Sequence, residues 1–224
     1  MGQLNFYAIE PYLRELPEAI VITLELSAIV IILSIAFGFV GAILRTKSSA
    51  FVRYLLIGYV EVMRNVPLLA LLYIFYFSLP QLGIRLSGFT CAVIAITLNS
   101  TAYMIEIFRG GLSAIPNGQF EAANSQGMRT VQIYRFIILP QLLRIVYAPV
   151  GNQIIACVIG TSAASIVTVS EVTAWMESTG ASTFRFFEVF LVIAAVYLVL
   201  CQAINFGRVV IGWLLFGRMG DSRS

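Results

Sequence analysis

The chain has 224 residues, of which 59% are hydrophobic and only 11% are charged, and its mean hydropathy is +0.92. Soluble domains are about 25% charged, so this composition excludes an ordinary water-soluble protein. Histidine is absent, and Cys91, Cys157 and Cys201 stand alone in apolar runs, which argues against a metal site, a disulfide framework and histidine-based catalysis. We predict an all-α integral membrane protein, one domain over residues 1–224, that is not an enzyme.

The first 18 residues precede the first long apolar run. Phe6, Ile9, Leu13 and Leu16 recur at helical spacing, which predicts that residues 1–18 form an external amphipathic segment lying on the membrane surface. The apolar run that follows is too long for a cleavable signal peptide and is preceded mainly by glutamates. We therefore expect it to be retained.

Five apolar segments are long enough to cross a bilayer. A spanning helix takes about 20 residues, because in lipid the backbone must satisfy its own hydrogen bonds. The segments run from Ala19 to Leu44, from about Tyr54 to Leu79, from Phe89 to about Phe108, from about Ile145 to Val169, and from Phe186 to about Phe216. We therefore predict five transmembrane helices.

Basic residues near the ends of these segments predict the orientation. With the N-terminus outside, three arginines are external, namely Arg14, Arg85 and Arg185. Ten basic residues are then cytoplasmic: Arg45, Lys47, Arg53, Arg109, Arg129, Arg135, Arg144, Arg208, Arg218 and Arg223. Basic residues concentrate on the cytoplasmic side of membrane proteins, so we expect the N-terminus outside and the C-terminus inside.

The longest polar connection, residues 113–140, joins the third and fourth spans on the predicted cytoplasmic side. Pro116 can occupy the first turn of a helix and Gly127 can end it in a left-handed conformation. A second helix is expected to begin near Thr130 and to stop before Pro140. The connection is therefore predicted to be a helical hairpin held against the inner membrane face.

A long spaced motif lies in this hairpin. It reads Glu121-Ala122-Ala123, three residues, Gly127, nine residues, Ile137, one residue, Leu139 and Pro140. This resembles the E-A-A-x3-G-x9-I-x-L-P pattern of ATP-binding-cassette importer permeases at every fixed position. The resemblance implies a coupling helix that fits a groove on a cytoplasmic ATPase. The alternative is a hairpin that only connects two spans.

Further segments are similar to the polar amino-acid branch of that family, the histidine, glutamine and glutamate type. They are 64–69 (RNVPLL), 103–111 with Tyr103, Glu106 and Arg109-Gly110-Gly111, and 184–188 (FRFFE). One departure concerns the fourth span, where many members carry K-D-T-S-L and this chain has Ile159-Gly160-Thr161-Ser162-Ala163. The missing charged pair weakens the case for direct recognition of a charged substrate side chain by this chain.

Polar residues inside the predicted spans indicate where a solute could pass. Asn99, Ser100, Tyr103 and Glu106 form a stripe at helical spacing on the third span. This stripe either lines a substrate path or makes hydrogen bonds between helices. On the fourth span we expect interruptions at Pro149, Gly151, Asn152 and Gln153 and at Gly160, Thr161 and Ser162, the last three bordering the path. A plain kink is the alternative.

Ionisable residues in the spans are expected to be paired, because an isolated charge in lipid is costly. Glu61 with Arg64, and Glu106 with Arg109, are spaced for pairing within one helix. Glu25 lies in the first span without such a neighbour.

The resemblance implies several partners. They are a cytoplasmic ATP-binding-cassette ATPase that holds ATP and Mg, an external substrate-binding protein, and a second permease chain that we expect to be non-identical. We expect no cofactor on this chain, no nucleic acid, and a multi-pass location in a bacterial cytoplasmic (inner) membrane. The alternatives are a permease for another small polar solute, a membrane-embedded enzyme, and a channel-like or assembly protein.

Overall fold

The computed structural model describes residues 4–217, and every regular element in that range is helical. The prediction of an all-α chain is confirmed. The first half contains short turns η1 (Phe6–Ala8) and η2 (Glu10–Arg14), then α1 (Leu16–Lys47), α2 (Ala50–Asn65), α3 (Leu68–Tyr73), η3 (Ile74–Ser78), η4 (Leu79–Leu82) and α4 (Gly88–Ser113). The second half contains α5 (Asn117–Ser125), α6 (Thr130–Ile133), η5 (Tyr134–Ile138), α7 (Leu139–Gly160), η6 (Thr161–Val167), α8 (Val172–Thr183) and α9 (Phe186–Phe216).

Four helical stretches of the described range are long and apolar enough to cross a membrane. They cover Leu16–Thr46, Gly88–Ser113, Thr130–Val167 and Phe186–Leu215. A fifth candidate is a broken pair, Ala50–Asn65 with Leu68–Leu82, bent by 103°. Five spans are therefore present if the broken pair counts as one, but the predicted second span is not a straight helix.

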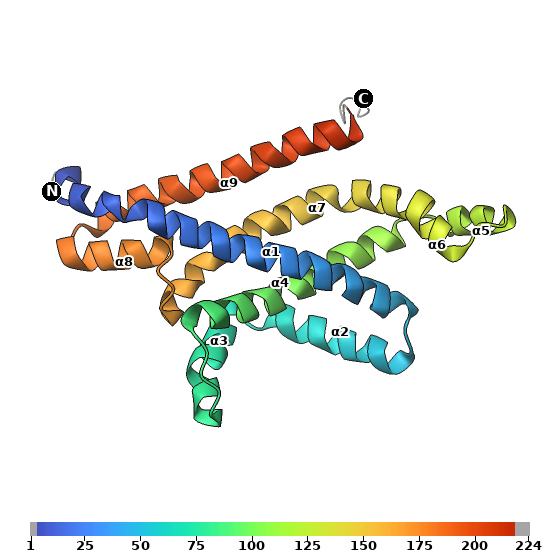
Figure 1. Cartoon of the computed structure of the whole chain (residues 1–224), viewed down its shortest axis with the longest axis horizontal. Coiled ribbons are helices and arrows are strands. Elements are labelled where there is room, and N and C mark those ends of the chain that lie inside the picture. The colour runs from blue at the N-terminus through green and yellow to red at the C-terminus, as the bar shows by residue number, and fades with distance from the viewer. Residues whose placement is uncertain (1–3, 218–224) are drawn as a thin grey trace.

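Pro67 explains that break. Proline has no backbone N–H and disfavours helical backbone at the residue before it. Val66 is extended, at φ −86° and ψ 128°, and ends α2, while Pro67 at φ −57° and ψ 135° precedes α3. Figure 1 shows α3 leaving the side of the bundle at a wide angle to α2.

The fourth span differs from its prediction at two prolines. Pro140 does not end a helix, because α6, η5 and α7 follow one another without a gap and Leu139 N–H bonds to the Tyr134 carbonyl five residues back. This wider turn, η5, lies directly before the proline. Pro140 itself lies in the first turn of α7, where a backbone N–H is not required. Pro149 lies inside α7, and the helix also continues through the following Gly151, Asn152 and Gln153, so the expected interruption there is wrong. The α-helix ends at Gly160, where a 3-10 turn begins.

The centre of the bundle is α4, which packs against α1, α2 and α7. Small residues bring α1 close to it. A Cβ built at Gly38 would overlap Met104, and one at Gly41 would lie 2.7 Å from the Ile105 side chain. The buried residues of α4 include Ala92, Ala95, Ala102 and others of similar small size, and this also allows close approach.

The N-terminal segment is folded onto the bundle. Instead of the expected regular amphipathic helix it forms the 3-10 turns η1 and η2. Ile9 is buried with Trp175 and Val189, and the Trp175 indole N–H donates to the Tyr12 carbonyl at 3.0 Å. The segment therefore covers the end of α8 and α9.

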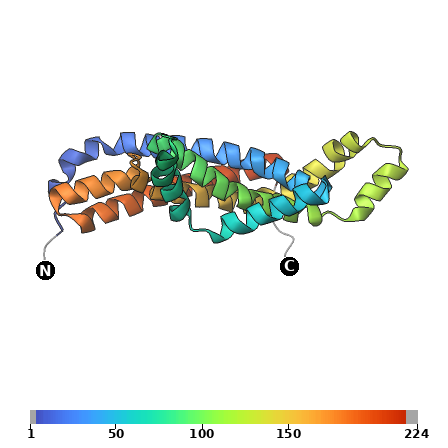
Figure 2. The same cartoon turned by 90° about the horizontal axis from the view of Figure 1, so that it is seen from below.

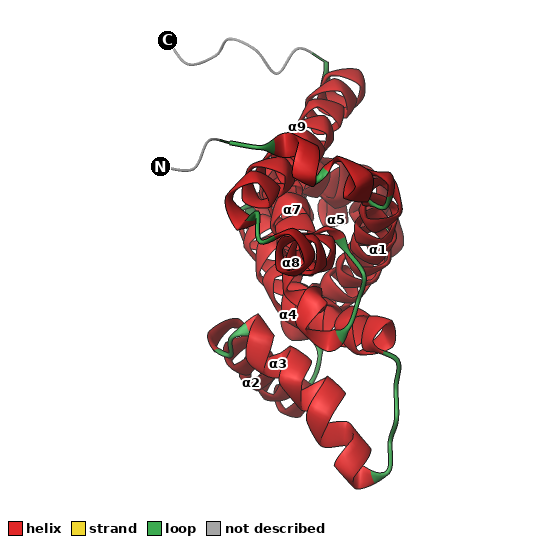
Figure 3. Cartoon of the chain, turned by 90° about the vertical axis from the view of Figure 1, so that its left-hand side faces the viewer, coloured by secondary structure: helices red, strands yellow, loops and turns green. Residues whose placement is uncertain are grey.

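The long helices run along one axis, which gives the molecule two ends (Figure 2). The N-terminal turns and the α8–α9 connection lie at one end, and the α1–α2 connection and the α5–α6 hairpin lie at the other (Figure 1). Viewed along that axis, α1, α4, α7 and α8 form the compact body, while α2 and α3 lie to one side of it (Figure 3).

Candidate functional site

The α5–α6 hairpin projects beyond the ends of the long helices (Figures 1 and 2). The turn between α5 and α6 caps the C-terminus of α5, and in it Gly127 has a left-handed backbone at φ +73°. Gly127 N–H donates to the Asn124 carbonyl at 2.9 Å, and Met128 N–H donates to the Ala123 carbonyl at 3.2 Å. A left-handed residue is best supplied by glycine, since a Cβ strains this backbone. The expected role of Gly127 in ending the first hairpin helix is confirmed.

Apolar contacts hold the hairpin as one body. Ala123, Ile133 and Ile138 are buried in a cluster that continues into α4 and α7, and the rings of Phe120 and Tyr134 meet edge to face with centroids 5.6 Å apart. The start of α6 is also fixed, because Arg129 N–H donates to the Gln132 side chain at 2.8 Å. The hairpin is therefore packed against α4 and α7 through one continuous apolar cluster.

The predicted motif residues divide between the outside and the inside of this body. Glu121, Ala122, Gly127, Leu139 and Pro140 are exposed, Ala123 is buried, and Ile137 is half-buried. The tip of the hairpin thus exposes Glu121, Ala122 and Gly127, while Ala123 packs inward.

The polar stripe of α4 faces α2 and α7. The Asn99 amide donates to the Met63 carbonyl at 2.7 Å, and the Tyr103 hydroxyl lies 3.5 Å from the Arg64 carbonyl. Ser100 is buried and accepts a bond from the Cys157 thiol at 3.2 Å. Hydrogen bonding between helices, one of the two alternatives for this stripe, is therefore present.

The other predicted path residues lie where α7 becomes η6. Thr161 is buried with its hydroxyl on the Val158 carbonyl at 2.7 Å, whereas Ser162 is half-buried and its hydroxyl donates to the Ile159 carbonyl at 2.7 Å. Gly160 faces Leu68 of α3, since a Cβ built there would lie 3.6 Å from that side chain. The structure thus brings this turn beside α3, but does not bring it into contact with Asn99 or Tyr103 through any described hydrogen bond.

A second polar group joins the C-terminal part of α1 to the C-terminal part of α4. Glu106 and Arg109 pair at 2.7 Å, as their spacing predicts, and Arg45 of α1 pairs with the other carboxylate oxygen of Glu106. Sequence reasoning missed Arg45, which lies 61 residues away from Glu106. Two arginines on one carboxylate fix the end of α1 against the root of the hairpin.

The predicted pairing of Glu61 with Arg64 is wrong. Glu61 accepts from the Asn65 amide at 3.2 Å, and the Arg64 guanidinium lies 5.4 Å from the centre of the Tyr103 ring. A cation over an aromatic face is a favourable alternative to an ion pair. Glu25 is exposed on α1.

Comparison with known proteins decides the family. Residues 34–211 match the family described as binding-protein-dependent transport system inner membrane component. The chain belongs to that family of transport permeases. It is 35% identical to a probable glutamine ABC transporter permease of Bacillus subtilis, over 83% of this chain and 86% of the relative. It is 31% identical to the glutamine transport system permease of Escherichia coli, over 91% and 94% of the two chains.

A solved structure agrees with this assignment. The permease superposes on a chain of an amino acid ABC transporter crystallised with histidines, with a TM-score of 0.86 and 28% identity, covering 94% of this chain and 98% of that one. The predicted resemblance to importer permeases of the amino-acid type is confirmed by these relatives. Membership in a permease family also means that the chain is a transport subunit.

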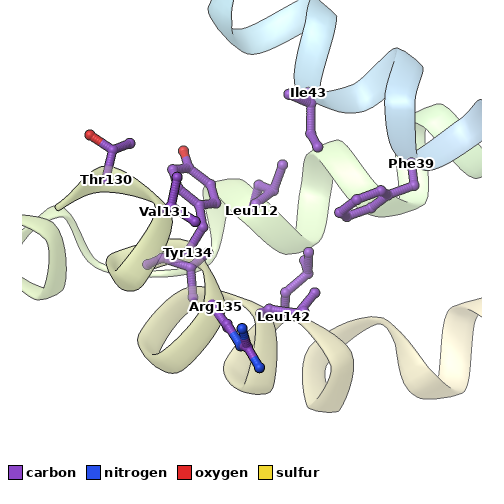
Figure 4. A pocket seen from close by; sticks show the side chains of 10 residues that line it. Phe39, Ile43, Leu112, Thr130, Val131, Tyr134, Arg135 and Leu142 are labelled. Carbon is purple, nitrogen blue, oxygen red and sulfur yellow. The ribbon is translucent and has the colours of Figure 1, made fainter.

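An apolar groove of about 390 Å³ lies at the root of the permease's hairpin (Figure 4). Phe39 and Ile43 of α1 form one wall, and Val131, Tyr134 and Leu142 of the α6–α7 stretch form much of the other. Its lining is almost wholly apolar, with Arg135 at its edge. The groove has no polar groups arranged to bind a polar solute.

A buried carboxyl group at the start of α8 was missed by the sequence analysis. Glu171 is fully buried, caps α8 by accepting from Ala174 N–H at 2.9 Å, and accepts from the Tyr197 hydroxyl at 2.9 Å. Burial raises the pKa of Glu171 above its ordinary value of 4.5, while the backbone and Tyr197 hydrogen bonds oppose that rise. An acidic residue before an apolar helix start was the available signal.

Proposed function

We propose that this permease forms half of the translocation pore of an ATP-driven importer for polar amino acids. The family is binding-protein-dependent, which supports an external substrate-binding protein as a partner. The names of the two glutamine permeases and of the amino acid transporter support the substrate class. In this scheme the chain binds no cofactor of its own, and ATP and Mg reside on a cytoplasmic ATPase.

The projecting hairpin is the observation that carries the coupling role. Its tip is exposed at one end of the molecule, its core is buried, and its last turn is continuous with α7 through η5. A partner that binds Glu121 and Ala122 would thus move α7 and, through Glu106 and Arg45, α1. We propose that Glu121, Ala122, Ala123, Gly127, Ile137, Leu139 and Pro140 form the coupling element for the ATPase.

Two substitutions test the coupling element. Gly127→Leu places a bulky side chain on left-handed backbone, a strain of about 1–2 kcal/mol, and Glu121→Lys reverses the charge at the tip. Both variants are expected to insert normally but to lose most substrate-stimulated ATPase activity and uptake in proteoliposomes containing the whole complex.

Matched controls separate docking from folding. Asn tolerates left-handed backbone better than other non-glycine residues, so Gly127→Asn is expected to retain most activity, as is the uncharged but similarly shaped Glu121→Gln. Normal uptake in both Gly127→Leu and Glu121→Lys would contradict the coupling assignment. It would favour a hairpin that only connects two spans.

For the solute we propose a path bordered by the polar face of α4 and the turn at the end of α7. The residues concerned are Asn99, Ser100, Tyr103, Glu106, Gly160, Thr161 and Ser162. We choose Ser162 for the test, because its half-buried side chain lies in the turn that follows α7. Uptake by Ser162→Ala should fall by a similar factor for every accepted amino acid, and a changed ranking would show that this residue reads the side chain.

We further propose that the working importer contains a second, non-identical permease chain. Ile159 and Gly160 stand where many relatives of the amino-acid branch carry a charged pair, so selection of a charged side chain would fall to the other chain. Native mass spectrometry of the purified complex tests this, because a single permease mass present twice would contradict it.

A further inference from the structure

The break between α2 and α3 leaves the last backbone carbonyls of α2, beginning with that of Met63, without their helical donors. In a continuous helix the Met63 carbonyl would accept from the N–H of the residue four positions later, which is Pro67 and has no N–H. Val62 still accepts from Val66 N–H at 2.9 Å, so the loss begins at Met63. Met63 lies 13 residues into α2, about 20 Å from its start at 1.5 Å per residue, and its side chain is half-buried.

Asn99 of α4 supplies the missing donor. Its side-chain amide donates to the Met63 carbonyl at 2.7 Å, a short hydrogen bond in a part-buried position. One turn further along α4, the Tyr103 hydroxyl approaches the carbonyl of Arg64, the residue after Met63, at 3.5 Å. One turn earlier on α2, the Tyr59 hydroxyl donates to the Leu98 carbonyl at 2.6 Å. Three contacts thus fasten α2 to α4 up to the point where the chain bends.

We propose that Asn99 is a positioning residue for transport, whose amide replaces the absent N–H of Pro67 and fixes the direction in which α3 leaves the bundle. This deepens the proposed function and rests on it. The direction matters because α3 packs on the segment that we place beside the solute: Leu71 and Leu72 share a buried cluster with Ala164 and Val167 of η6. Leu68, the first residue of α3, faces Gly160.

This role differs from contact with the solute. A solute contact would make Asn99→Leu raise the KM for the solute, and it would leave α3 unchanged in the empty protein. A positioning role predicts loosening of the α2–α3 break without any solute, together with a similar loss of maximal uptake for all solutes and an unchanged KM.

Hydrogen–deuterium exchange on the purified, solute-free complex tests the proposal. Asn99→Leu removes the donor at nearly constant volume, and the backbone amides of residues 64–73 are expected to exchange about three to ten times faster, the effect of losing one intramembrane hydrogen bond. Asn99→Gln keeps an amide donor and should restore most of the protection. Thr97→Val is the matched control, since the buried Thr97 hydroxyl of the same helix has no hydrogen-bond partner among the described residues.

A double-mutant comparison tests the link to Pro67. Pro67→Ala returns a backbone N–H that can reach the Met63 carbonyl, so Asn99→Leu should accelerate exchange less in that background than in the parent. An equal effect in both backgrounds, or no acceleration by Asn99→Leu, would overturn the proposal. Exchange is read on the permease itself, so a failure of ATP-driven uptake, which would refute the proposed function, leaves this result readable.

Discussion

At the scale of single residues, the buried carboxyl of Glu171 is the least expected feature. A buried ionised carboxylate is stable only with a charged or strongly hydrogen-bonding partner. Between residues 4 and 217 the described ion pairs do not include Glu171, and its partners are the Ala174 N–H and the Tyr197 hydroxyl. Burial is the largest influence on this group and raises its pKa, so the neutral form is favoured in the folded permease.

The direction of this pKa shift determines how the stability of the permease depends on pH. Because the pKa of Glu171 is higher in the folded than in the unfolded chain, its contribution to stability is greatest below the ordinary value of 4.5 and is lost as pH rises through the folded value. Glu171→Gln keeps an oxygen for the Ala174 N–H but does not ionise. We expect the thermal midpoint of the variant minus that of the parent, both measured in detergent, to be larger at pH 7.5 than at pH 5. A constant difference would show that Glu171 does not titrate differently on folding.

Residue-level prediction from sequence succeeded where partners are close along the chain. The pair Glu106 and Arg109 follows from helical spacing alone, and Gly127 follows from its place after a helix. Arg45 and the Met63 carbonyl were not predictable as partners of Glu106 and Asn99, because these contacts depend on how α1 and α2 pack against α4. Such packing is set by side-chain shapes over the whole bundle.

At the scale of elements, apolar length identified the long helices but did not predict the break at Pro67, since the second span was expected to run unbroken from about Tyr54 to Leu79. The breaks expected at Pro140 and Pro149 are absent, because Leu139 N–H bonds to the Tyr134 carbonyl directly before Pro140 and because Pro149 lies inside α7. Glycine allows α1 to pack closely against α4. Gly38 faces the backbone and side chain of Met104, while Gly58 on α2 has nothing within 4 Å of a built Cβ.

These two glycines form a matched pair for testing helix packing. Gly38→Ala must push α1 away from α4 and is expected to destabilise the permease by about 1–3 kcal/mol, the usual range for overpacking. Gly58→Ala meets no neighbour and should be neutral or gain up to about 1 kcal/mol from helix propensity. Thermal unfolding of both variants in detergent checks this, and equal midpoints would mean that the α1–α4 contact has room for a methyl group.

At the scale of the whole molecule, the two ends can be compared with the predicted division of three external and ten cytoplasmic basic residues. Arg14 and Arg185 belong to the end that carries the N-terminal turns and the α8–α9 connection, and Arg129 belongs to the projecting hairpin at the other end. Arg218 and Arg223 lie outside the described residues. Arg14 and Arg185 thus lie at the opposite end of the axis from Arg129, and the positive-inside rule favours the hairpin end as cytoplasmic.

Site-directed labelling tests that orientation. In a background with the three cysteines replaced by alanine, single cysteines at Tyr7 and Phe184, which are 85% and 84% exposed, mark one end, and a cysteine at Asn117 marks the hairpin. An impermeant maleimide added to intact spheroplasts is expected to label the first two positions, and Asn117 only after permeabilisation. The physical reason is that moving the arginines of the hairpin across the bilayer is far less favourable than leaving them at the inner face. Labelling of Asn117 alone in intact spheroplasts would reverse the orientation and would place the hairpin out of reach of any cytoplasmic ATPase.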